Sequence, residues 1–126
     1  MDNTSIFNSV TTLRGFVSDL KETIFRRKTG SFVFLTRCIQ RYLDLIENRC
    51  KICSSYIGKN DLAEHSIHVI TREIADIRKV LFEINIVSDH NDSFLEIEEE
   101  IYDSFDQIEL HIEYLEAMFS NQEVSQ

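Results

Sequence analysis

The chain of 126 residues contains no proline and only three glycines. Because proline interrupts helices and glycine marks turns, this scarcity favours long, uninterrupted helices. No apolar run approaches the ~20 residues needed to span a bilayer, and the N-terminus lacks the basic-then-apolar order of a signal peptide. The three cysteines are an odd number, which favours reduced thiols over disulfide bridges. We therefore expect a cytoplasmic protein.

Motifs for catalysis and phosphate binding are missing as well. The chain has no glycine-rich phosphate loop, no Gly-x-Ser-x-Gly motif and no HExxH motif. Ser54, Ser55 and Cys38 have no base or orienting residue at a defined spacing. We therefore expect a protein that is not an enzyme and needs no cofactor. Nucleic-acid binding is disfavoured by the net charge of −9.

Basic residues are absent from the last third of the chain. All 13 lysines and arginines lie at or before Lys79, whereas twelve of the 22 acidic residues lie between Asp89 and Glu123. Residues 1–86 therefore carry a small positive charge, and residues 87–126 carry a large negative one. Since charge determines partners more than fold, we expect a weakly basic body covered by one acidic element.

Apolar residues recur at spacings of three and four in four segments, which predict helices over about residues 4–28, 31–57, 60–86 and 93–119. The expected N-caps are Asn3 or Thr4, Ser31, Asn60 or Asp61, and Ser93 in a capping box with Glu96. Gly30 and Gly58 suit the positions that follow helix ends. Residues 87–92 are polar and are expected to form a loop.

Short connections force neighbouring helices to be antiparallel. The sequence therefore predicts an all-α, up-down-up-down antiparallel four-helix bundle. It forms a single domain over residues 1–126, with residues 120–126 as a frayed polar tail. Two alternatives remain open. The β-prone stretch Phe32–Leu35 permits a strand, and a long two-helix hairpin could dimerise into a bundle.

The acidic last helix is the first candidate site. Its carboxylates mostly fall between the apolar positions and should face solvent, where they would serve as a docking surface for a basic partner. The residues concerned are Glu99, Glu100, Asp103, Asp106, Glu109 and Glu113. Exposed apolar residues such as Phe32, Phe94 and Tyr102 could add contacts. A merely solvated face is the alternative.

A metal site is the second candidate. Cys50-Lys-Ile-Cys53 and His65-Ser-Ile-His68 supply two thiolates and two imidazoles, the ligands of tetrahedral zinc. The string resembles a C2H2 zinc finger, but its two histidines are only three positions apart, and the cysteines continue a helical apolar stripe. The alternative is that Cys50 and Cys53 act as small core residues.

The third candidate is a basic patch of Arg26, Arg27, Lys28, Arg78 and Lys79 at one end of the bundle, which could meet anionic lipid headgroups. Part of the chain resembles the HeLo-type N-terminal four-helix bundles, including the one in mixed-lineage-kinase-like proteins. The segments that resemble it are Phe34–Glu47 and His68–Leu81. The resemblance implies a regulatory bundle that self-associates or touches phosphoinositide membranes.

These observations lead to a non-enzymatic interaction module, an adaptor or inhibitory domain, that binds a basic protein partner through its acidic fourth helix. A homo-oligomer is compatible with this hypothesis. A membrane-associating bundle that uses the basic end and a zinc-stapled helical module are the alternatives.

Overall fold

A computed structural model describes the backbone of residues 3–25, 32–83 and 91–124. It contains four α-helices, α1 (Asn3–Phe25), α2 (Phe32–Tyr56), α3 (Asp61–Glu83) and α4 (Asn91–Val124). No strand occurs within these ranges. The prediction of an all-α four-helix bundle is therefore confirmed, and the strand through Phe32–Leu35 is wrong because α2 already begins at Phe32.

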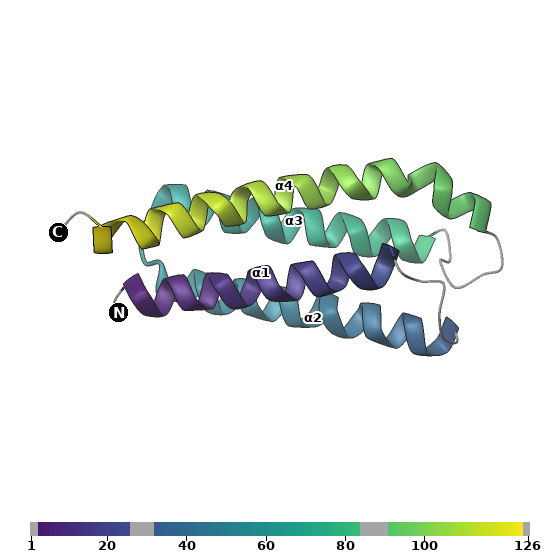
Figure 1. Cartoon of the computed structure of the whole chain (residues 1–126), viewed down its shortest axis with the longest axis horizontal. Helices are drawn as coiled ribbons and strands as arrows, with labels where there is room; N and C mark the ends of the chain where they lie inside the picture. The colour runs from purple at the N-terminus through teal and green to yellow at the C-terminus, as the bar shows by residue number, and fades with distance from the viewer. Residues whose placement is uncertain (1–2, 26–31, 84–90, 125–126) are drawn as a thin grey trace.

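The four helices form a closed ring in which each packs against two neighbours, in the order α1, α2, α3, α4 and back to α1. Neither diagonal pair has Cα atoms within 8 Å in the described residues. Figure 1 shows successive helices running in opposite directions along the long axis. The ring closes within one chain, so the dimerised hairpin is also wrong.

One apolar core runs along the axis of this ring. Every helix contributes a stripe of buried residues at spacings of three and four. The stripe on α4 consists of Ile101, Phe105, Ile108, Ile112, Leu115 and Phe119, of which Phe119 is the most exposed at 6%. Within the described residues no helix is long and apolar enough to cross a membrane.

The helix boundaries match the sequence prediction at some ends and differ at others. Asn60 is the N-cap of α3, because its Oδ1 accepts a hydrogen bond from the backbone N–H of Ala63 at 3.1 Å. The start of α4 was predicted wrongly. This helix begins at Asn91, so Ser93 already lies inside it instead of capping it.

The segment after Phe119, which the sequence predicts as a frayed tail, is helical as far as Val124, where α4 ends. The polar residues after Phe119 include neither proline nor glycine, so nothing stops the helix once Phe119 is anchored in the core.

The glycines Gly15 and Gly58 give a matched test of the backbone. Gly15 lies inside α1 with no atom within 4 Å of an added Cβ, whereas Gly58 has φ of +63° in the turn between α2 and α3. We expect Gly15→Ala to raise the free energy of unfolding by about 0.5–1 kcal/mol and Gly58→Ala to lower it by about 1 kcal/mol. Urea denaturation measures both, and changes of the same sign would contradict the assignment.

Candidate functional site

The carboxylates of α4 fall into two groups, because burial of the apolar stripe fixes the rotation of the helix. Glu109 and Glu116 lie one heptad apart on the side that faces α1. Glu99, Glu100, Asp103, Asp106 and Glu113 are exposed to solvent. The two groups differ in whether they have partners within the chain.

Two ion pairs hold α4 against α1. Arg14 binds Glu116 in a bidentate manner, with Nη2 2.6 Å from Oε1 and Nε 3.0 Å from Oε2, and the hydrogen bond raises the pKa of Arg14. The Nζ atom of Lys21 lies 2.8 Å from Oε1 of Glu109. The predicted site residue Glu109 is therefore already paired with a cation of its own chain.

Aromatic stacking completes this contact between α1 and α4. The rings of Phe25 and Tyr102 stack with centroids 4.1 Å apart, and Lys21 Nζ lies 5.9 Å from the Tyr102 centroid. Tyr102, which the sequence suggested as a docking residue, thus has a partner on α1. The side chains of Phe32 and Phe94 lie outside the described part of the structure.

A groove of about 490 Å³ runs between α3 and α4, on the side of α4 away from α1. Ile77, Val80 and Ile101 form its apolar part. Its carboxylates come from both helices: Glu73 and Asp76 from α3, Glu100 and Asp103 from α4. We call this set the acidic groove.

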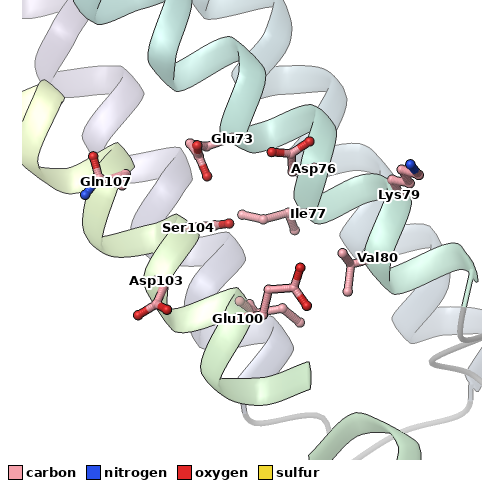
Figure 2. A pocket seen from close by; sticks show the side chains of 10 residues that line it. Glu73, Asp76, Ile77, Lys79, Val80, Glu100, Asp103, Ser104 and Gln107 are labelled. Carbon is pink, nitrogen blue, oxygen red and sulfur yellow. The ribbon is translucent and has the colours of Figure 1, made fainter. Parts of the chain in front are cut away.

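Figure 2 shows how the acidic groove is arranged. Glu73 and Asp76 lie along α3, and Glu100 on α4 extends its carboxylate into the space beside Val80. Asp103 lies on the outer side of α4, and the amino group of Lys79 points away from the groove. Within the described residues, none of the four groove carboxylates makes a hydrogen bond or ion pair with another side chain. The groove therefore concentrates uncompensated negative charge beside an apolar floor.

The predicted basic patch is divided in the structure. Arg78 binds Asp44 at 3.0 Å and also Glu47, so it links α3 to α2. Lys79 is exposed and lies at the acidic groove between α3 and α4. Arg26, Arg27 and Lys28 lie outside the described residues, and the lipid contact that depends on them stays a prediction.

The four predicted zinc ligands do not converge. Cys50 and Cys53 are buried, with 2% and 0% exposure, whereas His65 and His68 are exposed on α3. Among the residues that the structure describes, no three His, Cys, Asp or Glu side chains gather so that they could hold a metal ion. The cysteines instead extend the core stripe of α2.

Both core thiols are held in the protonated form. Burial raises the pKa of Cys50 to about 12, and burial likewise raises the pKa of Cys53. The Sγ atom of Cys53 lies 3.3 Å from the buried hydroxyl of Ser9 on α1. These thiols are therefore poor nucleophiles as long as the bundle is folded.

A cluster that sequence reasoning missed lies farther along the α3–α4 interface. The hydroxyl of buried Ser66 lies 3.1 Å from Nδ1 of His111. The His111 ring packs edge-on against His65 on α3, with centroids 5.7 Å apart, and against Tyr114, at 5.2 Å. Burial lowers the pKa of His111, and the charges of His65 and Arg72 lower it further. No local motif indicates this cluster, because its members are brought together only by the packing of two helices.

Comparisons with protein-family models, curated proteins and solved structures each found no match to this chain.

The cysteines provide a test of the core assignment. We expect Cys50 and Cys53 to react with a disulfide reagent at least about tenfold more slowly in the folded protein than in denaturant, because they are buried and protonated. Half-buried Cys38 provides the internal comparison. Mass spectrometry of labelled peptides resolves the three rates. A strong chelator should leave the melting temperature unchanged, and a fall would instead support a zinc staple.

His111 predicts a pH dependence of stability. Its pKa is lower in the folded chain than in the unfolded chain, so the unfolded state takes up the proton first as pH falls. The contribution of neutral His111 to the free energy of unfolding is therefore fully present above the ordinary histidine pKa of about 6.5, and it is lost as pH falls below that value. We expect His111→Gln, which retains a hydrogen-bonding group for Ser66, to reduce the loss of unfolding free energy on acidification.

The size of this effect is at most about 1 kcal/mol, because His111 is partly exposed and solvent screens its neighbours. Urea denaturation at neutral and mildly acidic pH measures it. His68→Gln is the matched control, since His68 is exposed and lies outside the His65–His111–Tyr114 cluster. An equal effect of both substitutions would show that the cluster is not responsible.

Proposed function

We propose that this protein is a non-enzymatic interaction module whose acidic groove binds a cationic segment of a protein partner. One observation carries the proposal. Carboxylates from two helices line the groove without partners in the described chain, whereas Glu109 and Glu116 on the same helix are neutralised by α1. The internal ion pairs thus leave the excess negative charge concentrated on one side of α4.

The composition of the groove favours lysine and arginine side chains as its occupants. Both have apolar stems that pack on apolar surfaces while their charged ends remain hydrated. Here Ile77, Val80 and Ile101 offer the apolar surface, and the carboxylates lie at its edges. A volume of about 490 Å³ accommodates a few such side chains at once.

The mode of binding follows from the exposure of these charges. Exposed ion pairs are individually weak and screened by salt, so recognition depends on several of them acting together and on fast association. The walls belong to two packed helices, so the groove is preorganised. These properties suit an adaptor or inhibitory domain. The free cysteines support a cytoplasmic setting for it.

The experiment uses a labelled synthetic helical peptide of lysine and alanine as the probe and fluorescence anisotropy as the readout. We expect it to bind, and Glu100→Lys/Asp103→Lys to weaken binding about tenfold or more, because two attractive contacts become repulsive. Binding should also weaken as salt rises.

Asp19→Lys/Glu64→Lys is the matched control, since it changes the net charge equally at exposed sites outside the acidic groove. It should change the affinity much less than the groove variant. An equal loss in both would mean that only net charge matters, and absence of peptide binding to the wild type would reject the proposal. Circular dichroism checks that each variant remains folded.

A further inference from the structure

The outer face of α2 carries charges of the sign that the acidic groove requires. Arg37 and Arg41 are exposed one turn apart, and within the described chain neither makes an ion pair. Leu45 and Ile52 follow on the same side at helical spacings and are only half-buried. A shallow depression lined by Arg37, Arg41 and Leu45, among others, lies on this face. The face thus carries two cations, Arg37 and Arg41, with the half-buried Leu45 and Ile52 farther along the helix.

The exposed side of α4 has the complementary order. Glu99 and Asp103 are exposed one turn apart, and Leu110 and Tyr114 follow with 38% and 46% of their surface exposed. Ile52 follows Arg41 by 11 positions (52 − 41), and Tyr114 follows Asp103 by the same 11 positions (114 − 103). Along an α-helix this separation is about 16 Å. If α2 of one copy lay parallel to α4 of another, the arginines of α2 would therefore meet the carboxylates of α4. The apolar residues of the two helices would also meet.

We propose that a second copy of this chain docks the outer face of its α2 along the acidic groove and the adjoining surface of α4. Arg37 and Arg41 lie against the groove carboxylates, and Leu45 and Ile52 lie against Leu110 and Tyr114. The inference rests on the proposed function, because it names one occupant of the same groove.

The overall charge opposes this contact only at long range. Each copy carries −9, but repulsion between separated charges is screened beyond about 8 Å at physiological ionic strength. Asp44, the acidic residue on the α2 face, is bound to Arg78 of its own chain. At moderate salt the long-range repulsion is screened and the local attraction between the two surfaces prevails. Association weakens at very low salt, because the repulsion between the copies is unscreened, and at very high salt, because the attraction itself is screened.

The placement of the two surfaces determines the kind of assembly. α2 and α4 occupy diagonal positions in the ring, so the docking face and the groove lie on opposite sides of one copy. Contacts of this kind are heterologous and extend head to tail instead of closing a two-fold dimer. One helix in a groove covers less than the ~800 Å² per partner typical of tight complexes, so association is expected at roughly 0.1 mM.

The experiment is sedimentation velocity over a concentration series, with two single-surface variants of the full chain. The α2 variant is Arg37→Glu/Arg41→Glu, and the groove variant is Glu100→Lys/Asp103→Lys. We expect the wild type to associate and each variant alone to require at least about tenfold higher concentration. An equal mixture should recover species of two or more copies, because the intact groove of one variant accepts the intact α2 of the other.

Lys59→Glu/Arg72→Glu is the control for the α2 variant, with the same change of net charge at exposed residues outside α2 and outside the acidic groove. It should associate like the wild type. A mixture that stays monomeric, or a wild type that stays monomeric while it still binds the lysine–alanine peptide, overturns self-association and leaves the proposed function standing. Loss of both peptide binding and self-association in the wild type would reject both.

Discussion

The position of every carboxylate on α4 depends on the burial of one apolar stripe. Ile101, Phe105, Ile108, Ile112 and Leu115 are almost completely buried, and a helix that buries them has only one rotation about its axis. That rotation directs Glu109 and Glu116 toward α1 and leaves Glu100 and Asp103 on the other side. The hydrophobic core thus decides which charges are neutralised, although it contains no charge itself.

Ion pairs between neighbouring helices then neutralise some of the charged side chains. α1 supplies Arg14 and Lys21 to α4, and α3 supplies Arg78 to α2. The interface between α3 and α4 instead places Glu73 and Asp76 opposite Glu100, and the amino group of Lys79 points away from them. Like charges at an interface cost stability, so this contact is held by its apolar residues and by the Ser66–His111 hydrogen bond farther along.

The sequence was sufficient for the features that depend on local periodicity. Helix number, the core stripes and the Asn60 cap follow from spacing and capping chemistry, and the structure contains them. Features that depend on which helices are neighbours could not be predicted from the sequence. The pairing of Glu109 with Lys21 and the meeting of His65 with His111 require the ring order and handedness of the bundle. The zinc hypothesis came from motif spacing, which takes no account of the burial of Cys50 and Cys53 in the core stripe of α2.

The same uncompensated charge would link folding to the proposed binding. The segment of α4 has eleven acidic residues and no basic residue, and two of the acidic residues are paired with α1. Mutual repulsion among the acidic residues of α4 destabilises the compact state. A cationic occupant of the acidic groove would remove part of this repulsion. If the proposed occupant binds the folded chain, it stabilises that chain by mass action. Salt screens both the repulsion and the attraction, so it should stabilise the free protein while it weakens the complex. These opposite signs separate a binding role for the carboxylates from a solubilising one, because a merely solvated face has no complex to weaken.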